Sequence, residues 1–433
     1  MTLMFDKKLI DRIRLTFPRA AADFNERKRA FFDNGTATLV VEKAATAEAE
    51  ARINWSANVG GIFDESKQAT DTIRSGRQAV ADFLNASDPS TIVSGESATS
   101  LLFNLSYAFG KELTGSENIV TTDYEHYTNV DPWVELENRG KVNQVRFAKL
   151  NMEEGTLDMD HLQELIDSKT KIVTITAASN MLGTKSPLKE IGKLARDVGA
   201  YFVVDAVHHI PHGPTDVQAL DCDFLVFSGY KLFTSHGSFL YGKKELLEAL
   251  QPFKVRTAPT TPPGKFEWGT RNQAMFAAIN GVMEHLLWLS EEVQSNYEGQ
   301  YLEFEDNKRS LKIVMDAIEQ YETGLSSAVL TGVDNVPGLL DIPEVTVYGL
   351  TDLKRLDERD PTFSFEVENV PEEEVELRLW KEGGIAARSG HYYSLAQDVY
   401  NKQKIVRISL VHYNTLEEVK IFLKTLNEIC KTN

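Results

Sequence analysis

The sequence predicts an α/β protein with a doubly wound, mostly parallel sheet and a second, smaller α+β domain. Short β-branched runs alternate with amphipathic segments between about residues 90 and 250, which is typical of strands and crossover helices. The pattern changes after about residue 290, and 433 residues are enough for more than one domain. We therefore expect a large domain over residues 19–290 and a small domain made from residues 1–18 and 291–433.

Six short apolar runs of the first region read as strands covered on both faces. They are Thr91–Ser94, Asn118–Thr122, Val142–Phe147, Lys171–Thr176, Tyr201–Val204 and Phe224–Phe227. Helical periodicity predicts helices over Ala98–Leu113 and Leu188–Val198, and Gly199 stands where a helix commonly ends.

The C-terminal third has a different order of elements. A charged stretch from Glu291 to Tyr321 predicts one long helix. Strands are expected at Val345–Tyr348, Thr362–Val367 and Ile405–Leu410, and helices at Glu372–Lys381 and Leu416–Ile429. Thr415 and Glu418 form a capping-box signature before the last helix.

Composition excludes several classes of protein. The net charge of −18 argues against binding to nucleic acid or to an anionic membrane surface, because both require positive potential. No apolar run has the length of a membrane span, and the charged N-terminus does not resemble a signal peptide. Two cysteines provide no disulfide framework. We expect a cytoplasmic protein.

Polar residues follow three consecutive predicted strands, where ligands bind in open α/β sheets. Asn180 follows the strand at 171–176, Asp205 ends the next strand, and Ser228 and Lys231 follow the third. Each residue alone has a simpler explanation as a turn, cap or surface residue. Their order at strand-end spacing predicts that an amide, a carboxylate and an amine point into one crevice.

These three groups suit pyridoxal phosphate. A carboxylate keeps the ring nitrogen protonated, and a lysine of lowered pKa forms the Schiff base. Asn180 would contact the ring hydroxyl, while Ser228 and the helix start after Ser97 would hold the phosphate. Glu96 argues against a phosphate there unless its carboxylate points away.

Eight segments, in order, resemble the class-V aminotransferase family of fold-type I pyridoxal-phosphate enzymes, in its cysteine desulfurase and selenocysteine lyase branch. They are Phe31–Ala37, Glu125–Asn129 with Pro132-Trp133, Ala178–Thr184, Val204–His208, Ser228–Lys231, Glu267–Thr270, Arg388–His391 and Arg407–Thr415. The resemblance implies a homodimer with an active site shared between subunits.

The resemblance also implies a role for each matching residue. Lys231 would be the Schiff-base lysine, Asp205 the partner of the pyridine nitrogen, and His126 a ring-stacking residue that assists proton transfer. Arg407 would bind the substrate carboxylate. The remaining implied contacts are Asn180 with the ring oxygen, Ser97, Ser228 and the partner subunit's Thr270 with the phosphate, and Arg388 as a second active-site arginine.

This chain departs from the branch at three positions. His208 replaces a glutamine and Tyr230 a histidine, and both positions contact the cofactor in the family. Tyr393 stands where the pattern Arg-x-Gly-His-His-Cys carries the persulfide-forming cysteine. Cys222 precedes a predicted core strand and Cys430 lies in the last predicted helix, so neither is placed to accept sulfur.

The expected activity is lyase-type chemistry at Cα or Cβ of a small amino acid, without a protein persulfide. Transamination and epimerisation, which also occur in the family, remain alternatives. His391, Tyr392 and Tyr393 are expected to line the side-chain end of the substrate and to donate hydrogen bonds there.

Two other classes of function remain open. His208, His209 and His212 form H-H-x-x-H, and in a helix His208 and His212 would share a face as zinc ligands do, which would suit a metal hydrolase. Pro211 and Pro214 argue against such a helix. The third class is a non-catalytic protein that retains the cofactor.

Overall fold

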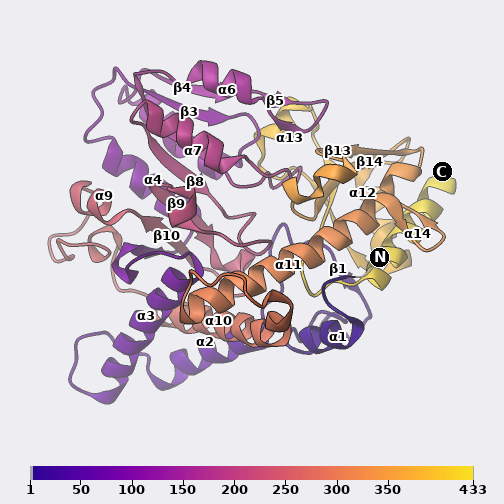
Figure 1. The fold of residues 1–433 in the computed structure, drawn as a ribbon, viewed down its shortest axis with the longest axis horizontal. Coiled ribbons are helices and arrows are strands. Elements are labelled where there is room, and N and C mark those ends of the chain that lie inside the picture. Colours follow the sequence, from indigo (N-terminus) through magenta and orange to yellow (C-terminus); the bar gives the residue numbers. More distant parts are fainter. Residues whose placement is uncertain (1–2, 433) are drawn as a thin grey trace.

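The computed structural model describes residues 3–432, and a seven-stranded sheet forms its larger part (Figure 1). The strand order is β2-β10-β9-β8-β7-β3-β4, and every strand is parallel to the others except β10, which is antiparallel to both of its neighbours. The strands are β2 (Ile92–Gly95), β3 (Asn118–Thr122), β4 (Gln144–Ala148), β7 (Thr170–Thr176), β8 (Tyr201–Asp205), β9 (Phe224–Ser228) and β10 (Ser238–Gly242). The expected doubly wound, mostly parallel sheet is confirmed, whereas β10 was not predicted.

Alternate residues of the strands enter two separate hydrophobic cores, one on each face of the sheet. Val203 packs with α4 (Ala98–Phe109) and α5 (Asp131–Asn138), while Val204 packs on the opposite face. That second face is covered by α3 (Asp64–Phe83), α7 (Leu188–Asp197) and α10 (Gln273–Val293). Helices on both faces explain why the strands are continuously apolar.

A second sheet forms the other part of the molecule, on the right of Figure 1. Its order is β13-β14-β17-β16, and all neighbours are antiparallel. The strands are β13 (Val345–Tyr348), β14 (Thr362–Val367), β16 (Arg388–Gly390) and β17 (Ile405–Ser409), with helices α12 (Glu372–Arg378) and α14 (Leu416–Lys431). Thr415 and Glu418 form the predicted capping box at the start of α14.

The long helix expected over Glu291–Tyr321 is wrong. The chain forms α10, a short 3-10 turn over Gln294–Tyr297, and then α11 (Asp306–Thr331). Gly299 (φ 78°) and Tyr301 (φ 56°) have left-handed backbone conformations, which interrupt an α-helix. The sequence pattern missed this break because charged residues continue on both sides of Gly299.

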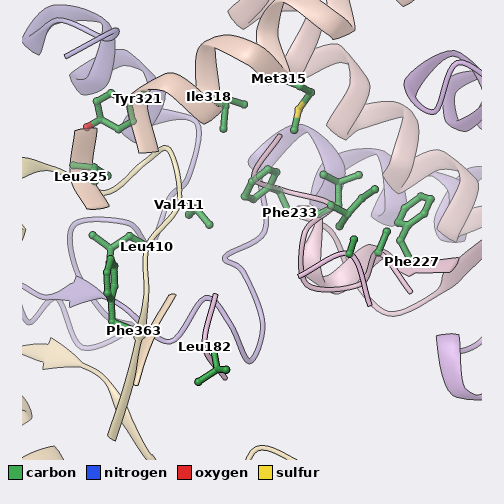
Figure 2. Packing of buried hydrophobic residues seen from close by; sticks show 14 of the residues in the cluster. Leu182, Phe227, Phe233, Met315, Ile318, Tyr321, Leu325, Phe363, Leu410 and Val411 are labelled. Atoms are coloured by element: carbon green, nitrogen blue, oxygen red, sulfur yellow. The ribbon is translucent and has the colours of Figure 1, made fainter. Parts of the chain in front are cut away.

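Helix α11 joins the two sheets through its buried side. Met315 and Ile318 lie toward Phe233 of the large sheet region, and Tyr321 and Leu325 lie toward Leu410 and Val411, which follow β17 (Figure 2). One hydrophobic cluster therefore extends from the large sheet to the small one. This continuous packing fixes the small sheet against the carboxyl ends of the parallel strands.

The remaining elements are short or peripheral. They are α1 (Lys7–Leu15), β1 (Ala30–Phe31), α2 (Glu42–Asn54), β5 (Leu150–Asn151), β6 (Thr156–Leu157), α6 (Met159–Leu165), α8 (Val217–Leu220), α9 (Lys244–Ala249), β11 (Gly332–Val333), β12 (Val336–Pro337), β15 (Ile385–Ala386) and α13 (Leu395–Val399). Among residues 3–432, no helix combines the length and the apolar character needed to cross a lipid bilayer.

Candidate active site

A cavity of about 230 Å³ lies at the carboxyl ends of three neighbouring parallel strands. The residues that end β7, β8 and β9, namely Thr176, Asp205 and Ser228, all line it. Residues from the small sheet close the opposite side. The cavity therefore contains every site residue expected from the sequence except Thr270: Ser97, His126, Asn180, Asp205, His208, Ser228, Tyr230, Lys231, Arg388, His391, Tyr393 and Arg407.

Lys231 follows β9 in a single 3-10 turn and is 8% exposed. Its Nζ donates a hydrogen bond to the carbonyl of Gly35. Burial, reinforced by the positive charge of Arg407, lowers the pKa of the Lys231 amine to about 7, against the opposing effect of Asp33 and Asp205. A large share of this amine is thus neutral, and nucleophilic, near neutral pH.

Asp205 is the last residue of β8 and is 3% exposed. One carboxylate oxygen accepts a hydrogen bond from the backbone N–H of Val207 at 2.9 Å. Burial raises the Asp205 pKa to about 6, while that hydrogen bond and the charge of Lys231 act in the other direction. A cationic ring nitrogen beside the carboxylate would favour its ionised form.

The N-terminus of α4 forms one end of the cavity. Ser97 caps the helix by accepting from the N–H of Ser100 at 3.1 Å, and Ala98 and Thr99 of the first turn line the cavity with it. The first N–H groups of a helix have no partner within the helix and attract anions. Glu96 is exposed and does not line the cavity, so its carboxylate does not oppose an anion there.

His126 stands at the wall beside this helix. Its Nδ1 accepts a hydrogen bond from the N–H of Thr128 at 3.1 Å, so the neutral ring carries its proton on Nε2. Burial, with smaller effects of Lys231 and Arg407, lowers the His126 pKa to about 4. The ring is therefore neutral at physiological pH and is able to stack on another aromatic ring.

Asn180 and His208 complete the polar lining near the strand ends. The amide nitrogen of Asn180 donates to the carbonyl of Tyr392 at 2.9 Å, whereas its Oδ1 is buried without a partner. His208 Nε2 lies 3.0 Å from Thr362 Oγ1, and the Thr362 hydroxyl donates to Ser409 Oγ at 2.8 Å. Since Thr362 uses its only proton on Ser409, His208 is the donor to Thr362.

Arg407 of β17 is 2% exposed and is held from three sides. Its guanidinium donates to the carbonyl of Asn180 at 2.8 Å and to Thr36 Oγ1 at 2.9 Å, and it stacks 3.8 Å from the ring centroid of Tyr392. Asp33 lies 3.8 Å away. The guanidinium is thus fixed in position before any ligand binds.

The segment around Gly35 contributes to the site in a way that sequence reasoning missed. It supplies the carbonyl bonded to Lys231 and the Thr36 hydroxyl bonded to Arg407. A Cβ at Gly35 would lie 2.4 Å from Ser409 Oγ, so only glycine permits this close approach. The matched segment Phe31–Ala37 was the available signal, but no role was assigned to it.

The residues after β16 lie at the mouth of the cavity. His391 pairs with Asp398 at 3.1 Å, and Tyr393 is 64% exposed with a left-handed backbone (φ 53°). Tyr392 lines the cavity as expected, but the structure contradicts the expected hydrogen-bond donation, because its hydroxyl already donates to the carbonyl of Arg388 at 2.5 Å. Its ring instead supports Arg407.

Thr270 lies outside this cavity, in an exposed depression that Val59 and Val255 also line. Thr270 also lines a neighbouring depression with Glu96 and Ser100, on either side of Ser97 in the sequence, but it does not line the cavity of Lys231. The expectation places Thr270 in the site of the neighbouring subunit, and it stays a prediction.

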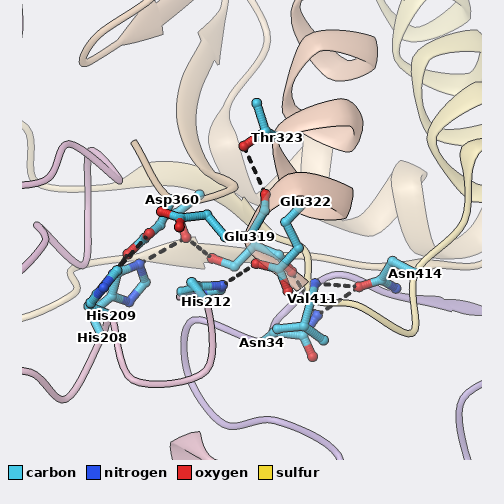
Figure 3. A network of polar contacts seen from close by, with 12 residues as sticks. Asn34, His208, His209, His212, Glu319, Glu322, Thr323, Asp360, Val411 and Asn414 are labelled. Carbon is cyan, nitrogen blue, oxygen red and sulfur yellow. Dashed lines mark hydrogen bonds and ion pairs between the residues drawn. The ribbon is translucent and has the colours of Figure 1, made fainter. Parts of the chain in front are cut away.

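The H-H-x-x-H segment forms a buried polar network between the two sheets rather than a helix (Figure 3). His209 lies 3.1 Å from Asp360, and His212 lies 2.7 Å from Glu322 of α11. Potential ligand atoms of His208, His212 and Asp360 lie within 4.8 Å of one another. All three residues are buried and have partners within the protein: His208 bonds Thr362, His212 bonds Glu322 and Asp360 bonds His209. The geometry favours a structural connection over a hydrolytic metal centre.

Comparison with known proteins agrees with this geometry. The sequence profile of a family described as "Aminotransferase class-V" matches residues 30–306 and 308–422. A "Probable cysteine desulfurase" from Synechocystis sp. is 32% identical over 430 residues, which covers 96% of this chain and 94% of the relative. A "Cysteine desulfurase" from Pectobacterium carotovorum is 30% identical over 437 residues, 97% of this chain and 98% of the relative.

Solved structures have the same architecture. The apo structure of a cysteine desulfurase from Thermococcus onnurineus superposes with a TM-score of 0.81 at 27% identity, covering 98% of both chains. A cysteine desulfurase from Escherichia coli gives a TM-score of 0.77 at 24% identity over 99% of both chains and supports the fold alone.

Proposed function

Because the chain belongs to the aminotransferase class-V family of pyridoxal-phosphate enzymes, we propose that Lys231 binds this cofactor covalently and that the enzyme acts on a small amino acid at Cα or Cβ. The observation that carries the proposal is the convergence of Lys231, Asp205 and Arg407 on one cavity. A buried amine of lowered pKa, a buried carboxylate and a buried guanidinium are what a lysine-linked cofactor and an α-amino acid together require.

The residues of the cavity fit the cofactor. Ser97, Ser228 and the first turn of α4 offer donors for its phosphate, and Asp205 offers an anion for its ring nitrogen. The buried, unpartnered Oδ1 of Asn180 is a free acceptor that would suit the ring hydroxyl of the cofactor. When bound, pyridoxal phosphate supplies an electron sink that weakens the bonds at Cα of an amino acid. His208 and Tyr230 provide the other expected cofactor contacts.

Protein groups then account for orientation and proton transfer. Arg407 holds the substrate α-carboxylate by a two-pronged contact, since its guanidinium is already fixed by Thr36, Asn180 and Tyr392. The free amine of Lys231 would be a base of suitable pKa for the α-proton. His126 has a neutral ring whose Nε2 proton is available at the same wall.

We propose that no protein persulfide forms. Tyr393 occupies the position expected for the persulfide cysteine, and its side chain is exposed at the cavity mouth. Cys222 is fully buried and Cys430 is 8% exposed in α14. Burial raises the pKa of both thiols, which keeps them in the unreactive protonated form. The resulting activity is that of a lyase, with an aminotransferase or epimerase as the alternative.

We also propose a homodimer in which Thr270 reaches the phosphate site of the partner subunit. Exposed apolar side chains near Thr270 support this arrangement, because large apolar groups in water mark contact surfaces. They include Val59 (36% exposed), Val255 (64%) and Trp268 (56%). The division into a large domain, 19–290, and a small domain, 1–18 with 291–433, belongs to the same proposal.

A spectral screen of the purified holoenzyme tests the function. Each amino acid is added in turn, the visible spectrum is recorded, and the product of every responder is identified. The proposal predicts a response to at least one small amino acid, with release of a keto acid or an unsaturated or inverted product. A holoenzyme that responds to no amino acid would be a cofactor-retaining binding protein instead.

A further inference from the structure

The cavity contains a second arginine that no protein group neutralises. Arg388 of β16 lines the cavity and is exposed, and among residues 3–432 no carboxylate lies within ion-pair distance of its guanidinium. Asp398 and Glu376, two acids that contact the residues following Arg388, are engaged by other groups. Asp398 bonds His391 and Tyr127 at 3.1 and 2.5 Å, and Glu376 accepts from the N–H of Ser389 at 2.7 Å.

Arg388 also faces another positive charge. It pairs directly with Arg407 across the antiparallel strands β16 and β17, so both side chains lie on the same face of the sheet. Directly opposed residues have Cβ atoms about 5 Å apart, and like charges in such a pair are destabilising. The fixed contacts of Arg407 leave it no freedom to move away.

An anion bound in the cavity would offset the repulsion between two opposed arginines on its wall. Asp33 lies 3.8 Å from Arg407, and within residues 3–432 its carboxylate is not in ion-pair distance of Arg388. If the α-carboxylate takes Arg407, one cation remains unpaired at the mouth, where the substrate side chain must lie. His391 lies at the same mouth, with its Nε2 3.1 Å from Asp398.

We propose that the substrate is an α-amino acid with an anionic side chain, and that Arg388 binds the side-chain anion. This inference rests on the proposed function, because it assigns Arg407 to the α-carboxylate. A guanidinium contact to a carboxylate is directional and charge-assisted, so a neutral amide of the same shape cannot replace it. Arg388 is then the residue that determines specificity.

Pairs of isosteric acids and amides test the proposal. The holoenzyme is titrated with L-aspartate, L-asparagine, L-glutamate and L-glutamine, and dissociation constants are taken from the visible spectrum. At least one acid is expected to bind about tenfold or more tightly than its amide, in line with one charge-assisted contact. In Arg388→Gln the ratio should fall to about one, with the amide affinity unchanged.

The control is Arg74→Gln, which removes the same charge from an exposed arginine of α3 far from the cavity in the fold. Its acid-to-amide ratio should match that of the parent. Retained visible absorbance and an unchanged melting temperature show that Arg388→Gln is folded and loaded.

Three results would overturn the proposal in different ways. Equal affinity for acids and amides in the parent, with a response to neutral amino acids, refutes the anionic side chain and leaves the proposed function intact. A loss in Arg388→Gln that is equal for acids and amides shows that Arg388 shares the α-carboxylate instead. The absence of any spectral response to any amino acid refutes the proposed function itself.

Discussion

Tyr392 lies beneath Arg407, with the guanidinium 3.8 Å from the ring centroid and the tyrosine hydroxyl turned back to the carbonyl of Arg388. The ring thus supports the arginine that we assign to the substrate carboxylate, while the hydroxyl ties the ring to β16. Recognition of the substrate therefore depends on a residue that need not touch it.

This relationship predicts that substitutions at Arg407 and Tyr392 weaken amino-acid binding to different degrees. Arg407→Ala should weaken amino-acid binding by about 100-fold, because a buried charged contact is lost. Tyr392→Phe keeps the ring and should weaken binding by less than about threefold, whereas Tyr392→Leu, which removes the cation–π contact, should cost more. Spectral titration with a responding amino acid provides the constants. Parent-like binding by Arg407→Ala would refute the carboxylate assignment.

Lys231→Ala should abolish the visible absorbance of the lysine-linked cofactor while leaving the fold unchanged. Removal of the amine leaves no covalent attachment, although the phosphate and ring contacts remain. The measurement is the absorption spectrum after incubation with pyridoxal phosphate and desalting, with Lys185→Ala as a control lysine outside the cavity lining. A parent-like spectrum in Lys231→Ala would show that another group binds the cofactor.

The pH dependence of cofactor capture follows from the Lys231 pKa of about 7. Only the neutral amine attacks an aldehyde, and the amine is neutral above its pKa. The rate at which the apo-protein gains visible absorbance should therefore rise with pH through a midpoint near 7 and then level off. Stopped-flow absorbance measures it. A midpoint near 10 would mean that burial and Arg407 do not act on this amine as described.

Thiol chemistry should be absent from the enzyme. Because Cys222 and Cys430 are buried and their pKa values are raised, the folded protein should resist alkylation, and cysteine as a substrate should leave no persulfide on either residue. Mass spectrometry of the native protein after treatment with cysteine and an alkylating reagent tests this. The denatured protein, which should label at both positions, is the control.

Glu322 should stabilise the fold by filling space and bonding His212, and not by carrying a negative charge. It is buried on α11, bonds His212 at 2.7 Å, and has one oxygen without a partner, and burial raises its pKa well above the usual range. A carboxyl that is neutral in the folded state tolerates amide replacement, so Glu322→Gln should change the free energy of unfolding by less than about 1 kcal/mol. Glu322→Ala should cost about 2–3 kcal/mol, because His212 loses its partner and a cavity forms. Denaturant unfolding distinguishes the two.

Sequence periodicity predicted most of the elements correctly where burial on both faces imposed a clear pattern. The ends of the strands near Thr176, Asp205 and Phe227 were predicted to within about one residue. Because these ends were placed correctly, the prediction that Asp205 and Lys231 point into one crevice was also correct. β10 was missed because one short apolar run after Lys231 does not reveal an antiparallel return. The break between α10 and α11 was missed because the left-handed conformation of Tyr301 leaves no compositional mark.

The sequence by itself determined that polar residues follow three consecutive parallel strands. An apolar strand followed by one polar residue is a local pattern that the sequence contains directly. Only the tertiary structure decided that Arg388 and Arg407 oppose each other, that Tyr392 supports Arg407, and that the segment at Gly35 reaches Lys231. The first two contacts depend on the antiparallel pairing of β16 with β17, and the third joins residues that are 196 positions apart in the chain. Their geometry depends on strand register and on how distant segments pack together, which no local pattern of residues encodes.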